Sequence, residues 1–173
     1  LNENLGELSG VKFNITNESE KSIPCKVQFI GIEGTKTPDL GPQNRAHGCK
    51  DQWHSERGDF FVALDPGKYK IVITRGPEHS RHEKEIEVNA GGTIDVKTVL
   101  KRLVKTPGWV STDFHNHSTP SGDNQCGTDD RLINLAAEHI EFAPATEHNR
   151  IYDWTPHIKK LGLTNEISTV IGL

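Results

Sequence analysis

The chain has 173 residues, of which 33% are hydrophobic and 25% are charged, and its formal net charge is −4. This composition fits a soluble protein of one or two modest domains. No apolar run is long enough for a transmembrane helix, so we expect no membrane span. The lysines and arginines are scattered over a mildly acidic chain, a distribution that gives no sign of nucleic-acid binding.

Residues 8–104 alternate apolar and polar side chains in short runs that are separated by turn residues. Short, regularly spaced strands of this kind predict a β-sandwich. The expected strands cover 11–15, 26–32, 59–64, 69–75, 84–88 and 93–100. A long loop, from about residue 34 to 57, is expected between the second and third of them.

The clearest part of this pattern is the segment GDFFVALDPGKYKIVITRG. Pro66 and Gly67 predict a turn, because proline presets φ and glycine tolerates positive φ. In the returning strand Tyr69, Ile71 and Ile73 share one face, since alternate side chains of a strand point the same way. We expect this face to lie in the core.

The pattern changes after a linker at 106–108. Strands are expected at 109–115, 142–146 and 168–171, with a helix that Thr128 caps and a shorter helix that Thr155 caps. Strands that alternate with helices predict a parallel α/β domain. Three strands are too few to close a barrel, so we expect the chain to stop partway through this domain. The predicted domains are therefore 8–104 and 105–173.

Two histidines, His115 and His117, end the first strand of the second domain, and His148 follows the next strand. The carboxyl ends of successive parallel strands meet at one edge of a sheet, where ligand sites lie. Convergent imidazoles are typical ligands of divalent metals, and Asp123 in the intervening loop would add a carboxylate. Asp123 has an alternative role as a cap of a loop turn.

The stretches DFHNHSTPSGDN and FAPATEHN, with a helix between them, resemble the opening of the PHP domain, which is named for polymerase and histidinol phosphatase. The SGDN wording is similar to the carbaryl-hydrolase-like branch of that family. The resemblance covers about residues 109–173 and implies the first β/α units of a distorted β/α barrel with two or three metals. By this resemblance His115, His117 and His148 match metal ligands, and Asp123 falls near a loop aspartate. The later glutamate of the family, in Gly-x-Glu, and its Asp-x-His have no counterpart in the chain.

The resemblance implies a metal-dependent hydrolase, in particular a phosphoesterase, with a small phosphoester as substrate. The expected cofactor is Zn, Mn or Fe, which lowers the pKa of a bound water. Asp113 and Glu147 are the expected catalytic carboxylates, with Asp113 orienting an imidazole from behind. Because the ligand set is partial, we expect incomplete metal occupancy, impaired catalysis by this chain alone, and self-association through the incomplete α/β part.

In the first half, GDFFVALDPGKYKIVI resembles the carboxypeptidase-regulatory or transthyretin-like β-sandwich. That module usually accompanies exported enzymes, which favours a periplasmic or extracellular location without fixing it. Cys25 and Cys49 would pair in such a compartment and leave Cys126 single; the alternative is three free thiols. The alternative function is non-enzymatic: a β-sandwich that binds or spaces, followed by a partial metal-binding segment.

Overall fold

A computed structural model describes residues 8–42, 45–46 and 49–172, in which seven strands form two sheets and two helices are short. Leu173, the end of the second expected domain, lies outside the described residues. The strands are β1 (Gly10–Thr16), β2 (Cys25–Ile32), β3 (Gln52–Ser55), β4 (Asp59–Ala63), β5 (Gly67–Thr74), β6 (His82–Val88) and β7 (Thr93–Val99). The helices are α1 (Thr128–Ala137) and α2 (Thr155–Lys160).

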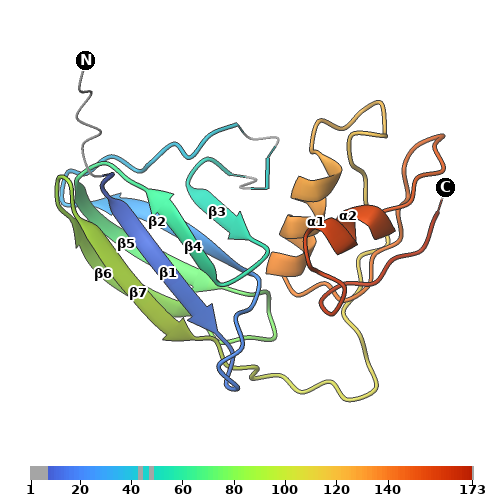
Figure 1. Cartoon of the computed structure of the whole chain (residues 1–173), viewed down its shortest axis with the longest axis horizontal. Coiled ribbons are helices and arrows are strands. Elements are labelled where there is room, and N and C mark those ends of the chain that lie inside the picture. Colours follow the sequence, from blue (N-terminus) through green and yellow to red (C-terminus); the bar gives the residue numbers. More distant parts are fainter. Residues whose placement is uncertain (1–7, 43–44, 47–48, 173) are drawn as a thin grey trace.

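The two sheets have the strand orders β4-β1-β7 and β3-β2-β5-β6. Strand β1 pairs with β7 in parallel, whereas the other pairs are antiparallel. Figure 1 shows all seven strands gathered in one part of the molecule and both helices in the other, with α1 next to β3. Each of the six strands expected from the sequence is present, with ends that move by one or two residues.

The buried faces of the two sheets share one hydrophobic core, which is a sandwich-like arrangement. As expected, Tyr69, Ile71 and Ile73 all point inward and are at most 1% exposed. Phe13 of β1 contacts Phe29 of β2, so aromatic packing joins the two sheets. Burial of each such side chain contributes about 1.5–3 kcal/mol, which makes this core the main source of stability in residues 8–100.

Strand β3 lies inside the segment that we expected to be one long loop, so that expectation is wrong for residues 52–55. It pairs antiparallel with the edge of β2, where Val27 faces Trp53 and Cys25 faces Ser55. Its four residues have no clean alternation of apolar and polar side chains, and this is why the periodicity does not predict it. It places a sheet edge directly against α1.

All three cysteines are free thiols, so Cys25 and Cys49 do not pair in this structure. Cys25 is fully buried in the sandwich core, and this burial raises the pKa of its thiol to about 12. Cys49 is exposed on the loop before β3.

After residue 104 the described chain has no regular strand, and the three expected strands appear as single parallel bridges. Phe142 bridges Thr112 on one side and Ser168 on the other, and Ala145 bridges Ile171. Helix α1 buries Leu132, Leu135 and Ala136 against these segments and α2. Contrary to our expectation, Thr128 is not the cap of α1: it is the first helical residue, and its hydroxyl hydrogen-bonds Ser118. Thr155 is likewise the first residue of α2, and Trp154 occupies the cap position.

Most exposed large apolar side chains of the described residues lie in this second part. They are Trp109, Val110, Phe114, Ile151, Val170 and Ile171, and Leu103 and Val104 lie just before this part. The helices cover one side of the bridged segments, and these side chains remain open to solvent elsewhere. Within the described residues, no helix has the length and apolar character needed to span a membrane.

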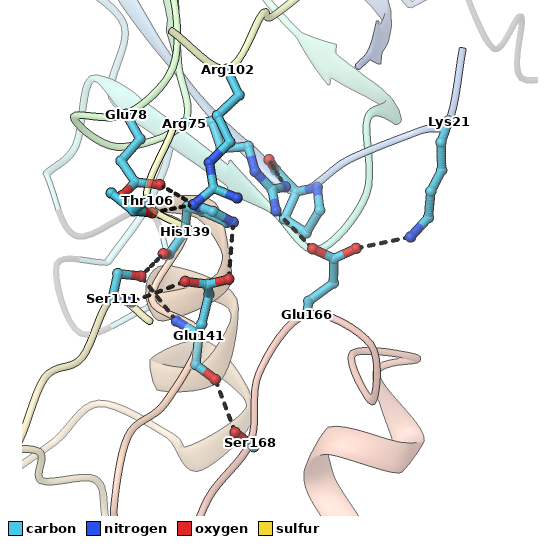
Figure 2. Close-up of polar contacts among 11 residues, drawn as sticks. Lys21, Arg75, Glu78, Arg102, Thr106, Ser111, His139, Glu141, Glu166 and Ser168 are labelled. Atoms are coloured by element: carbon cyan, nitrogen blue, oxygen red, sulfur yellow. Dashed lines mark hydrogen bonds and ion pairs between the residues drawn. The ribbon is translucent and has the colours of Figure 1, made fainter. Parts of the chain in front are cut away.

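The two parts are joined by a buried arginine at the end of β5. Arg75 is 3% exposed; it donates one hydrogen bond to the carbonyl of Pro24 (2.8 Å) and one to Glu166 of the second part (2.7 Å). Figure 2 shows Glu166 held between Arg75 and Lys21. A charge that has left water requires such partners, because an unpaired buried charge is costly.

We therefore expect Arg75→Ala to lower the free energy of unfolding by about 3 kcal/mol, since it leaves Glu166 with a single, weak partner in a half-buried place. Urea unfolding at neutral pH measures the change. The matched control is Arg81→Ala, which removes an exposed arginine and should cost less than about 0.5 kcal/mol. Equal effects of the two variants would contradict the assigned role of Arg75.

Candidate functional site

The three histidines expected as ligands lie together in the second part of the chain. The rings of His115 and His117 meet edge to face, with 4.8 Å between their centroids. The ring of His117 stacks on His148, with centroids 4.2 Å apart and planes 20° apart. Thus the ring of His117 lies between those of His115, from its own segment, and His148, from a later segment of the chain.

His117 is the least satisfied polar side chain of this cluster. Both its ring nitrogens are buried, and neither has a hydrogen-bond partner. Imidazole nitrogens in such a place normally bind a donor, an acceptor, a water or a metal. Its neighbours are more open: His148 and Asp123 lie at the surface, with 3.3 Å between His148 Nε2 and Asp123 Oδ2. The structure thus brings Asp123, the expected loop carboxylate, to the histidine cluster.

Glu147 has a different place from the one expected of a catalytic carboxylate. It is fully buried, and its oxygens accept hydrogen bonds from four donors. The donors are the backbone N–H (2.8 Å) and hydroxyl of Ser118, the hydroxyl of Ser121 (2.6 Å) and the indole N–H of Trp154 (3.1 Å). With both oxygens occupied, this carboxylate holds the protein together around the cluster.

The donors of Glu147 belong to the segments that carry the histidines. Ser118 directly follows His117, and the hydroxyl of Ser121 also accepts the backbone N–H of His148 (2.9 Å). Burial acts to raise the pKa of Glu147, but the hydrogen bonds from Ser118, Ser121 and Trp154 outweigh it and hold that pKa below its ordinary value. The group is therefore an anion at neutral pH that fixes the spacing of His117 and His148.

Asp113 lies at the start of the run that leads to the histidines. Its carboxylate accepts the backbone N–H of His115 at 3.1 Å. The bond closes a local turn, which is a common use of aspartate. In this arrangement Asp113 acts on the backbone of His115, and not on an imidazole nitrogen as the sequence led us to expect.

A cavity of about 470 Å³ opens beside His148. It is lined by Pro120, Gly122, Asp123, His148, Asn149 and Arg150. This volume is sufficient for a small molecule. The guanidinium of Arg150 gives the cavity a positive charge next to the histidines, and guanidinium groups bind phosphate and carboxylate groups well.

Within the described residues, no three His, Cys, Asp or Glu side chains already stand as a metal-binding group. The chemistry of the cluster nevertheless fits a metal, because the donor set consists of three imidazoles and an adjacent carboxylate, and because His117 has two buried nitrogens without a partner. A ligand set of this kind suits Zn, Mn or Fe.

Four residues of the site have no signal in the sequence. Ser118, Ser121 and Trp154 bind Glu147, and Arg150 lines the cavity. The two motifs indicate the histidines as ligands, but they do not indicate the residues that hold the histidines in place, since serine is common in polar loops. Only the Glu-His pair itself indicates that a carboxylate is needed at position 147.

No protein-family model matches the chain, and no curated protein is similar to it at a significant level. The function of the chain is therefore inferred from the geometry of the site.

We expect Glu147→Ala to lower the free energy of unfolding by about 3 kcal/mol or more, because the backbone N–H of Ser118, the hydroxyl of Ser121 and the indole N–H of Trp154 lose their buried acceptor. Urea titration with Trp154 fluorescence measures this loss. The control is Asp153→Ala, an exposed carboxylate nearby that accepts only the Thr155 N–H and hydroxyl, with an expected loss of about 1 kcal/mol. A loss at Glu147 no larger than the control would show that the buried network is not structural.

Proposed function

We propose that the second part of this chain is the metal-binding portion of a hydrolase that acts on phosphoesters, as in the PHP domain that it resembles. The observation that carries the proposal is the stack of His115, His117 and His148 beside Asp123. We propose that the seven-stranded part is a carboxypeptidase-regulatory-like accessory module. Neither family is identified by comparison.

A structural role explains this cluster poorly. A buried histidine that serves packing alone usually keeps at least one ring nitrogen hydrogen-bonded, because an unpaired buried polar group costs about 1–3 kcal/mol. His117 has no such bond, yet its loop is held firmly by Glu147 through Ser118. A site that is held rigidly and left unsatisfied is typical of a group that awaits a ligand.

In this proposal His115, His117 and His148 hold the metal, which supplies a water of lowered pKa and neutralises charge on the attacked group. Asp123 lies where it can bind the metal or orient His148 through Nε2. Glu147 positions the histidines, and Asp113 fixes the turn before them. Three imidazoles suffice for one metal with an open position for water. Because the ligand set is partial, we expect a single site that binds the metal weakly and at incomplete occupancy.

Phosphoesters are favoured as the substrate class because of the cation in the cavity. Arg150 lines the same cavity as His148 and Asp123 and is exposed at its mouth. A guanidinium binds a phosphoryl group with two parallel hydrogen bonds, and it does so for an ester of many different alcohols. The cation therefore selects the phosphoryl group and leaves the alcohol part of the substrate open.

The metal assignment predicts that His117→Ala combined with His148→Ala abolishes the binding of Zn or Mn that the unaltered chain shows, while the sandwich stays folded. Equilibrium dialysis with elemental analysis gives the stoichiometry, and circular dichroism reports the fold. The control, His82→Ala, removes a histidine on β6 far from the cluster and should leave binding unchanged. Undiminished binding in the double variant would place the metal elsewhere.

The substrate assignment predicts slow hydrolysis of a chromogenic phosphoester with added Mn or Zn, and its loss with a chelator. Arg150→Ala should raise KM about tenfold or more with a smaller change in kcat, since the guanidinium binds the ground state as well. Arg57→Ala, which removes an exposed arginine of the sandwich, serves as the control. Metal binding with no turnover on any phosphoester would contradict the hydrolase and favour a purely binding role.

One observation favours the alternative, a β-sandwich that binds a partner. A groove of about 300 Å³ crosses the outer face of β2 and β5. Its lining mixes long polar and cationic side chains, among them Lys26, Gln28, Gln52, Lys70 and Arg81. The two functions do not exclude each other, because the groove and the histidine cluster lie in different parts of the chain.

A further inference from the structure

Two other histidines meet at the boundary between the two parts. His79 comes from the turn between β5 and β6, and His139 directly follows the C-terminal cap of α1. Their rings pack edge to face, with 4.8 Å between centroids and 87° between planes. The side chain of His139 is only 12% exposed. Neither histidine belongs to the cluster described above.

The backbone of His139 is held in a conformation that histidine rarely adopts. Its φ is +58°, in the left-handed region. The end of α1 imposes this value. The backbone N–H of His139 donates to the carbonyl of Ala136 (3.1 Å), and that of Ile140 donates to the carbonyl of Leu135 (2.9 Å). Helices that end with this pair of hydrogen bonds usually have glycine or asparagine at the position of His139. The imidazole is therefore fixed against the sandwich at some cost to the backbone.

Both rings line a cavity of about 300 Å³ at the boundary, but one nitrogen of each ring is buried away from it. Nδ1 of His79 and Nδ1 of His139 are both buried without a hydrogen-bond partner. Close by, a Cβ atom on Gly76 would meet the carbonyl oxygen of Glu138 at 2.1 Å, so the two backbones are in direct contact. A proton added at either Nδ1 would place positive charge on a buried atom, beside the guanidiniums of Arg75 and Arg102 that line the same cavity.

The charged groups that face the pair come from every neighbouring element. The two cations are Arg75, which directly follows β5, and Arg102, which follows β7. The two anions are Glu78, 3.4 Å from Nδ1 of His139, and Glu141, 3.9 Å from Nε2 of His139. Figure 2 shows Glu78 already bound to Arg102 and Thr106, and Glu141 bound to Ser111. Beyond Arg75 lie Glu166 and Lys21, and Glu18 lines the same cavity. The carboxylates are thus engaged, while two guanidiniums act on both rings.

We propose that His79 and His139 form an acid-sensitive latch, which holds the two parts together when both imidazoles are neutral and releases the second part from the sandwich when they are protonated. The proposal stands on the contact of the two rings, their unpartnered nitrogens and the arginines beside them. It does not depend on the metal or on the hydrolase.

The direction of the pH effect follows from the surroundings. Burial, with the charges of His139, Arg75 and Arg102, lowers the pKa of His79 from 6.5 to about 4. Burial and Arg75 likewise lower the pKa of His139. A released histidine titrates near its ordinary value, so the released state binds more protons below that value. The closed boundary is therefore fully stable above about pH 6.5 and is weakened as the pH falls toward 4.

Opening of the boundary would affect the cluster of His115, His117 and His148 through a short series of hydrogen bonds. The carboxylate of Glu141 accepts the backbone N–H of Ser111 (2.9 Å), and the hydroxyl of Ser111 donates to the carbonyl of His139. Ser111 begins the run that leads to His115. A shift of His139 thus loosens the base of this run, so acid would alter the site through the backbone.

Hydrogen exchange of the whole chain tests the latch between about pH 7.5 and about pH 4.5, with rates corrected for the intrinsic effect of pH. We expect exchange at residues 128–142 to rise about tenfold or more, while the amides of β2 and β5 stay protected. In His79→Gln/His139→Asn this rise should disappear, because neither replacement titrates and asparagine tolerates the left-handed backbone. The single variant His79→Gln, which leaves α1 intact, should remove a large part of the rise.

Imidazole NMR titration gives an independent readout. We expect a midpoint near pH 4 for His79 and a midpoint below the ordinary value of 6.5 for His139. Ordinary midpoints for both residues, or an equal rise of exchange in the wild type and in both variants, would overturn the latch.

Discussion

A carboxylate that is wholly removed from water must be surrounded by donors, and Glu147 imposes this constraint on the second part of the chain. Its donors come from Ser118, Ser121 and Trp154, so two loops and the start of α2 have to converge on one point. His117 and His148 are neighbours of these anchored positions in the sequence. The stack of imidazoles is thus a consequence of where one buried charge is satisfied.

The strands of the sandwich were largely predictable because their core-facing residues follow a local alternation of apolar and polar side chains. Tyr69, Ile71 and Ile73 alternate with polar residues, and only one face of such a strand can enter the core. The edge strand β3 was not predictable in this way, since its pairing depends on the neighbouring β2 and not on a pattern of its own. The burial of Arg75 was not predictable either, because a charged residue after a strand is usually exposed and its partner Glu166 lies 91 residues away in the sequence.

The site was predictable in its residues but less so in their roles. The spacing of His115 and His117 and the position of His148 after the next segment indicated one cluster, and the structure brings the three rings together. The same reasoning assigned Glu147 to chemistry, because a sequence does not show how many donors a carboxylate will meet. The left-handed backbone of His139 likewise follows from the helix end and its packing, and no propensity of histidine indicates it.

The central claim is that the His115, His117 and His148 cluster binds a metal. A crystal structure of the chain grown with Zn or Mn, with diffraction data collected at the absorption edge of that metal, tests the claim most directly. The account predicts an anomalous peak about 2.0–2.1 Å from a ring nitrogen of each of His115, His117 and His148, with Asp123 or water completing the coordination. An absent peak at saturating metal, with the nitrogens of His117 hydrogen-bonded to water or protein, would contradict it.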